Sequence, residues 1–164
     1  MNVTDASENA PQKLYDKMKA VIDQEGLPGQ EAKEFSGVRL AFVGKNGRFF
    51  CFARAESSHS RITFYSIAPF VVPEERRVEM AQLLCRIHFG LPQGCFELDL
   101  DDGELRFRIS LRFADDDADE RMIRQALWAS VAGMDRYLPV LVSLAEQGLS
   151  PDKAMALISE DAAT

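Results

Sequence analysis

Hydrophobic positions change their spacing several times along the chain, and each change predicts a new element. Between Pro11 and Gly26 apolar residues recur at the three- to four-residue spacing of an amphipathic helix. Short apolar runs rich in β-forming residues then occupy 38–43, 49–53 and 61–67. The first part of the chain is therefore predicted to be one helix followed by three strands.

The second part repeats this order. Helical spacing predicts a helix over 73–90, strict alternation predicts a strand pair within 96–109, and two further helices are expected, a long one ending near Gly148 and a short one over 151–159. Three acidic residues, Asp115 to Asp117, are predicted to cap the long helix. The predicted inner stripe of the helix over 73–90 is Val78, Ala81, Leu84, Cys85 and Phe89.

Turn residues suggest how the strands pair. Asn46-Gly47 is a strong hairpin signal, and a two-residue turn there would place Val43 opposite Phe50 on one face of the sheet. Because both faces of this hairpin carry apolar residues, both are expected to be covered.

The second hairpin is predicted to turn at Asp102-Gly103, which pairs Leu98 with Phe107 on the buried face. The same register places two acidic residues opposite two arginines on the wet face. The expected charge pairs are Asp99 with Arg106 and Glu97 with Arg108.

These elements predict an α+β domain with a largely antiparallel five-stranded sheet flanked by helices, in the order α-β-β-β-α-β-β-α-α. A chain of 164 residues is long enough for one core, so residues 11–160 are expected to form a single domain. Residues 1–10 are expected to be a disordered leader, and 161–164 a tail.

The net charge of -7 argues against partners that present phosphates, so neither nucleic acid nor an anionic membrane is expected to bind. Segment 97–120 alone carries ten acidic residues against three arginines. The cysteines at 51, 85 and 95 have no metal or redox spacing and are expected to be buried free thiols. With no apolar run of spanning length, the chain is expected to be cytoplasmic.

No catalytic pattern is present. The sequence contains no glycine-rich phosphate loop, nucleophile elbow or zinc-protease motif. The carboxylates between Glu97 and Glu104 are explained by a wet strand face and a turn, and His59 and His88 have no partners at triad or metal spacing. Hence we expect no catalytic residue, no cofactor and no metal.

Segment 89–99 reads Phe-Gly-Leu-Pro-Gln-Gly-Cys-Phe-Glu-Leu-Asp and leads into Asp-Gly-Glu-Leu-Arg-Phe at 102–107. This signature resembles that of the YbjN-like family of bacterial sensory-transduction regulators, and the order of elements agrees from Lys13 to Ile158. The resemblance implies the fold of type III secretion chaperones, which are small, acidic, usually dimeric proteins that hold an extended client segment. It implies no catalytic residues.

Together these observations favour a non-enzymatic protein that binds a protein or peptide client, chaperone-like or regulatory, and acts as a homodimer. Surplus apolar residues are the candidate contacts with the client or the second subunit. They are Phe50, Phe52, Trp128 and Tyr137. Two alternatives stay open: a regulator of a signalling or stress pathway with one folded partner, and a small-molecule sensor.

Overall fold

In the computed structural model, which describes residues 9–113 and 118–161, the chain forms one antiparallel sheet and four helices. The strands lie in the order β1-β2-β3-β4-β6-β5. Their bounds are β1 Gly29–Ala32, β2 Gly37–Val43, β3 Arg48–Glu56, β4 Arg61–Val71, β5 Cys95–Leu98 and β6 Glu104–Arg112. The helices are α1 Asn9–Gln24, α2 Arg77–Gly90, α3 Glu120–Ala145 and α4 Pro151–Asp161. The predicted α+β class and antiparallel sheet are confirmed.

The sheet has six strands where the sequence predicted five. The additional strand, β1, pairs with β2 in the register Gly29 opposite Leu40. Its sequence, Gly-Gln-Glu-Ala, has no alternation of apolar and polar residues, so no sequence pattern indicates it. It is a strand because the neighbouring edge of β2 offers backbone hydrogen bonds.

The first hairpin turns earlier than predicted. Ala41 lies opposite Phe50 and Val43 opposite Arg48, so the predicted pairing of Val43 with Phe50 is wrong by two residues. The N–H of Gly44 donates to the carbonyl of Gly47 at 2.8 Å and closes the turn there. Because the shift is even, every side chain keeps its predicted face.

The tip of this hairpin is bound by helix α3. The Asp135 carboxylate accepts the backbone N–H groups of Lys45 at 3.1 Å and of Asn46 at 2.9 Å, and the Asn46 amide donates to the Asp135 carbonyl. These bonds hold the turn at 45–46. A contact between residues ninety positions apart in sequence therefore accompanies the register that local turn chemistry did not predict.

The second hairpin shows the same kind of shift. Leu98 lies opposite Leu105 and Glu97 opposite Arg106, instead of the predicted partners Phe107 and Arg108. The loop is wider than two residues, because the N–H of Asp99 donates to the carbonyl of Glu104. Glu97 still meets both arginines, with side-chain distances of 2.8 Å to Arg106 and 2.9 Å to Arg108.

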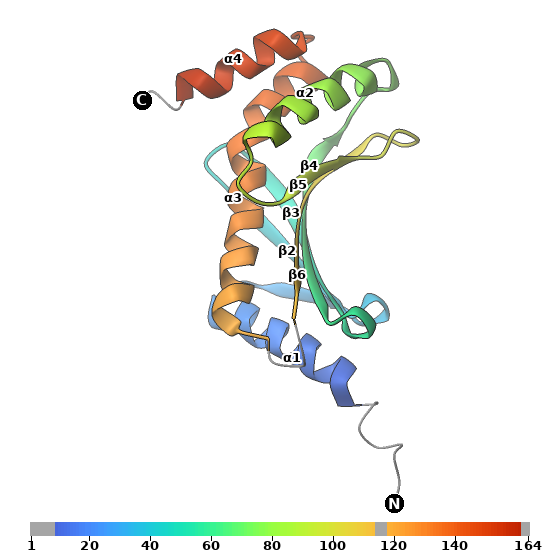
Figure 1. The fold of residues 1–164 in the computed structure, drawn as a ribbon, viewed down its shortest axis with the longest axis vertical. Helices are drawn as coiled ribbons and strands as arrows, with labels where there is room; N and C mark the ends of the chain where they lie inside the picture. The colour runs from blue at the N-terminus through green and yellow to red at the C-terminus, as the bar shows by residue number, and fades with distance from the viewer. Residues whose placement is uncertain (1–8, 114–117, 162–164) are drawn as a thin grey trace, which may run out of the picture.

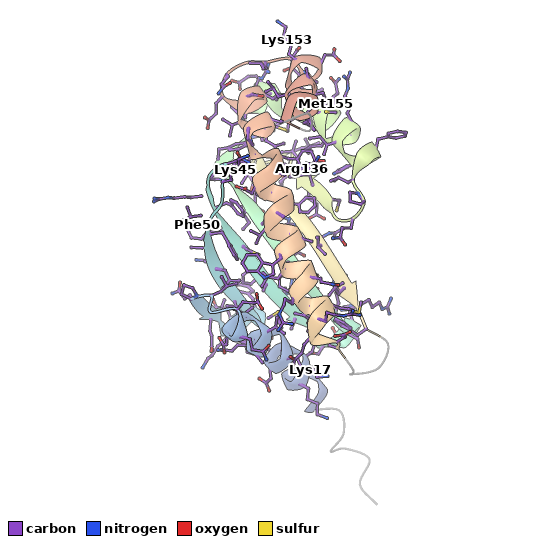
Figure 2. The ribbon with its side chains drawn as sticks, turned by 90° about the vertical axis from the view of Figure 1, so that its left-hand side faces the viewer. Lys17, Lys45, Phe50, Arg136, Lys153 and Met155 are labelled. Carbon is purple, nitrogen blue, oxygen red and sulfur yellow. The ribbon has the colours of Figure 1, made fainter. Side chains whose placement is uncertain are left out.

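All four helices lie on one side of the sheet (Figure 1). Helix α3 crosses this side, with α1 near one end and α2 and α4 near the other (Figure 2). A Cβ at Gly133 of α3 would collide with the ring of Phe107 on β6, so helix and sheet approach more closely than a larger residue allows. The core lies between these two layers.

Several predicted helix features are corrected. Helix α1 begins at Asn9, inside the predicted leader, whose residues 1–8 lie outside the described part of the chain. The cap of α3 is Asp119, whose side chain accepts the N–H of Arg121. The predicted caps, 115–117, belong to the undescribed segment 114–117. Of the predicted tail, 161–164, Asp161 is the last residue of α4, and 162–164 lie outside the described residues.

The predicted inner stripe of α2 is mostly on the wrong face. Phe89 is 96% exposed and Val78 is 69% exposed, whereas a neighbouring stripe is buried. The buried residues are Met80, Leu83, Leu84 and Ile87. Both stripes have helical spacing, so the periodicity alone did not distinguish them. Packing against the rest of the core selects one, and it leaves an apolar stripe of α2 facing outward.

We predict that Asp135→Ala lowers the free energy of unfolding by about 1–2 kcal/mol, because the two N–H groups at the hairpin tip lose their acceptor. Urea unfolding followed by circular dichroism measures the change. The matched control is Glu146→Ala, which removes an exposed carboxylate just after α3. Equal stability of the two variants would contradict a structural role for the Asp135 contact.

Candidate functional site

The side of the sheet turned away from the helices is free and concave (Figure 1). We call it the open face. Alternation along each strand places Phe50 and Phe52 of β3 on it, beside Ile67 and Tyr65 of β4. Both apolar faces were expected to be covered, by a helix or by a second subunit. Among the described residues, helices cover one face and leave the other uncovered.

An apolar strip, made of Phe50, Phe52, Tyr65 and Ile67, runs along the middle of the open face. Phe50 is 56% exposed, and the other three are half-buried. The ring of Phe52 lies against Gly37, where a Cβ would collide with it. Large rings that remain half in water are typical of surfaces that bind a partner.

Arginines flank the strip on both sides. Arg39 of β2 lies opposite Phe52 of β3, and Arg108 of β6 lies opposite Tyr65 of β4. The guanidinium carbon of Arg106 stands 4.6 Å from the centre of the Tyr65 ring, within cation–π distance. Seven arginines point to the open face from the described strands. They are Arg39, Arg48, Arg54, Arg61, Arg106, Arg108 and Arg112.

Only three glutamates point to the same face from the described strands. Glu56 pairs with Arg61 at 2.8 Å and Arg54 at 3.8 Å, so one carboxylate serves two guanidiniums. Glu97 likewise serves two, and Glu104 pairs with Arg106 at 3.3 Å. The described strand residues of the open face thus carry more arginines than glutamates in a chain whose net charge is -7, with Glu34, Asp99 and Asp102 at the border of the face.

A pocket of about 420 Å³ lies on the open face, lined by residues of the apolar strip and its flanking arginines. The short 3-10 helix Lys33–Phe35, which follows β1, borders it with Glu34 and with Phe35, an exposed ring. Aromatic rings and guanidiniums therefore converge on one surface that is open to solvent. Such groups offer apolar contact area and hydrogen-bond donors.

Of the four residues that the sequence singled out, Phe50 and Phe52 lie together on the open face, and the other two lie elsewhere. Trp128 is on α3, where its ring meets Phe42 edge-on at 5.9 Å and its N–H donates to Glu25 at 2.8 Å. Tyr137 is buried, with its ring 5.7 Å from that of Phe96. The arginines were missed as a group, because they come from strands far apart in sequence.

The histidine and cysteine side chains are those that could in principle react or bind a metal. The His88 ring accepts the backbone N–H of Phe96 at 2.8 Å through Nε2, and burial lowers the pKa of His88, so the neutral ring holds the start of β5. Cys51 is buried, and burial raises its pKa to about 12. The prediction of a buried thiol is wrong for Cys85, which is exposed, and Cys95 is half-buried.

Within the described ranges, no cluster of three or more histidine, cysteine or acidic residues is arranged to hold a metal ion. A search of the described helices for one long and apolar enough to cross a membrane also finds none.

Comparison with solved structures identifies the fold. YbjN from E. coli, proposed to be a transcription regulator, has a TM-score of 0.60 to this chain at 15% identity, over 81% of this chain and 92% of that chain. The chain has the YbjN fold. A chain of the ExsC–ExsE complex follows with a TM-score of 0.56 at 12% identity, over 80% and 95%. A chain of the HopA1–SchA chaperone–effector complex has a TM-score of 0.47 at 10% identity, over 76% and 93%.

The type III secretion chaperone-like fold implied by the sequence resemblance is therefore confirmed. Neither the family models nor the curated proteins contain a match to the sequence. At such low identities the structural likeness establishes the fold, and the function has to be argued from the surface of this chain.

The pair of Glu25 and Trp128 yields a test of how α1 is held against α3. Hydrogen bonds from Trp128 and from Arg124, the latter at 2.5 Å, lower the pKa of the Glu25 carboxyl. A carboxyl with a lowered folded pKa stabilises the fold above its ordinary pKa, and this contribution is lost as the pH falls through the folded pKa.

We predict that Glu25→Gln is less stable than the parent at neutral pH, and that the difference shrinks as the pH falls below the ordinary carboxyl range. Urea midpoints of both proteins at neutral and acidic pH measure this. Glu146→Gln, which neutralises an exposed carboxylate just after α3, is the control for general charge effects. A difference that stays constant with pH would contradict the assigned ionic role of Glu25.

Proposed function

We propose that this chain is a non-enzymatic binding protein that holds an extended segment of a protein client on its open face. The observation that carries the proposal is the apolar strip flanked by arginines on a concave, uncovered sheet. Apolar rings supply contact area, and guanidiniums supply direction through their fixed donors. The YbjN-like and chaperone-like fold is compatible with such a role.

A client bound across the open face fits the structure better than one added to an edge of the sheet. The two edge strands, β1 and β5, have four residues each, which gives a client few backbone partners. The open face offers side-chain contacts across the whole width of the sheet. We therefore place the client on the face, where Phe50 and Phe52 contact it.

The shape of the pocket argues for a polypeptide rather than a small molecule. Small-molecule sites enclose most of their ligand, whereas this pocket lies on an open surface and continues into the apolar strip. His59 lies in the 3-10 helix Ser57–His59, where its ring contacts Ser58, and His88 accepts the backbone N–H of Phe96, so neither lines the pocket. No role in this proposal requires a cofactor, a metal, nucleic acid or a membrane.

We also propose that the chain acts as a homodimer in the cytoplasm. The outward apolar stripe of α2, made of Val78, Cys85 and Phe89, supports a contact between subunits, because its largest ring is almost fully exposed. A free, exposed thiol at Cys85 is compatible with a reducing compartment. This stripe and the open face belong to different elements, so both can be occupied together.

A regulator with one folded partner is the second candidate function, favoured by the likeness to YbjN. The two candidates differ in the form of the partner. A short peptide should bind in the same way as an extended client segment. A folded partner would present a surface that a short peptide does not reproduce.

We predict that panning a random peptide display library against the protein enriches peptides that bind through the apolar strip. Phe50→Glu is expected to abolish their binding without loss of stability, because the ring is more than half exposed. Leu100→Glu is the matched control, since Leu100 is 60% exposed in the loop between β5 and β6. Binding is measured by fluorescence anisotropy.

The control is expected to bind like the parent. If no peptide is enriched, or if the selected peptides bind Phe50→Glu as well as the parent, the open face is not a peptide site. Capture of one folded protein in the absence of peptide binding would favour the regulator.

We predict that Phe89→Glu converts a dimer into a folded monomer, because it places a charge in the apolar stripe of α2. Light scattering after size exclusion, over a range of concentrations, measures the mass. Leu157→Glu, an exposed change on α4, is the control. A parent that is monomeric at every concentration would contradict the proposed dimer, without bearing on the peptide site.

A further inference from the structure

Arginines outnumber glutamates among the described strand residues of the open face, by seven to three. Three further carboxylates lie at its border, Glu34 beside β1 and Asp99 and Asp102 in the loop between β5 and β6. Glu56 and Glu97 each pair with two arginines, so the guanidiniums outnumber their carboxylate partners. Arg39 is exposed on β2 and forms no ion pair with any described residue.

Two of these arginines lie in one row across the sheet. The row runs from Arg39 on β2 through Phe52 and Tyr65 to Arg108 on β6. Strands are about 4.8 Å apart, so three intervals separate the backbones of the two arginines by about 14 Å. Apolar rings fill the space between them. The row therefore presents a cation, an apolar surface and a second cation.

An extended polypeptide repeats its side chains at a matching distance. Residues i and i+4 of an extended chain lie on the same face, about 14 Å apart at roughly 3.4 Å per residue, with residue i+2 between them. An acidic side chain at i and at i+4 would reach Arg39 and Arg108. An apolar side chain at i+2 would lie over Phe52 and Tyr65.

We propose that the open face selects client segments with the pattern acidic–x–apolar–x–acidic, bound across β2, β3, β4 and β6. This inference rests on the proposed function and adds the chemistry of the client. Arg108 already meets Glu97 at 2.9 Å, but a guanidinium has five N–H donors and can bind a second carboxylate. Arg39 has all its donors available to a client.

A peptide fits this face better than a nucleic acid does. Phosphates are densely and continuously charged, and their approach is opposed by a chain of net charge -7 and by the glutamates that lie between the arginines. A peptide with two separate carboxylates meets one acidic neighbour, Glu97 at Arg108, and has no charge over the apolar rings between Arg39 and Arg108. The spacing of charges therefore favours a polypeptide.

The probes are synthetic peptides with the core Glu-Ser-Leu-Ser-Glu, flanked by Gly-Ser repeats, and matched peptides in which Gln or Lys replaces both Glu. Backbone amide shifts of the isotope-labelled protein are followed by NMR during titration, which measures weak affinity and locates the site. We expect the Glu peptide to bind about five-fold more tightly than the Gln peptide at low salt, and the advantage to shrink as salt screens the pairs.

Arg39→Glu is expected to remove the preference for Glu over Gln. Lys153→Glu is the matched control, because it makes the same change in net charge at an exposed position on α4, at the end of the molecule (Figure 2). The control should keep the preference. Loss of preference in both variants would mean that overall charge, and not Arg39, sets it, and would overturn the inference.

The outcomes separate the inference from the proposed function. Equal binding of Glu and Gln peptides, both abolished by Phe50→Glu, would overturn the acidic pattern and leave peptide binding on the open face intact. Tighter binding of the Lys peptide would also overturn it. If an oligothymidylate shifts the same amides at lower concentration than the Glu peptide, the ligand is a nucleic acid and both proposals fail.

Discussion

The rest of the structure depends on the close packing of α3 against one face of the sheet. Gly133 brings the helix onto the ring of Phe107 at a distance that no side chain permits. Asp135, in the same part of α3, holds the tip of the first hairpin. Because the long helix packs this closely on the sheet, the core is one apolar layer between the helices and the sheet. The second face of the sheet is then free for another use.

A sheet face without a helix still has to limit its exposed apolar area. Here the rings are shielded by one another and by arginines, as Arg106 over Tyr65 shows. The stems of arginine side chains cover apolar surface while their charged groups stay in water. The groups that make the uncovered face tolerable to solvent are therefore the same groups that would bind a client.

The distribution of charge matters more than its sum. The chain as a whole is acidic, and the sequence between residues 97 and 120 is strongly so. The fold nevertheless collects arginines from β2, β3, β4 and β6 on one surface, where Glu56 and Glu97 are shared between them. A net charge describes how the molecule attracts or repels distant ions, whereas recognition depends on the groups within a few ångströms.

The sequence by itself determined the order of the elements and the face to which each strand residue points. Both follow from local periodicity, and the side chains of Phe50 and Glu97 kept their predicted faces although each register was shifted by two residues. It also indicated Phe50 and Phe52 as surplus apolar residues. Trp128 and Tyr137, chosen by the same criterion, also have contacts within the chain, where Tyr137 is buried and Trp128 stays 40% exposed.

Tertiary structure alone decided the registers, the strand β1, the buried stripe of α2 and the assembly of arginines on the open face. Each of these depends on contacts between residues distant in sequence, such as Asp135 with Asn46 or Arg39 across the sheet from Arg108. Periodicity states which side of an element is apolar. It does not state what packs there, because that is settled by the competition among all surfaces for one core.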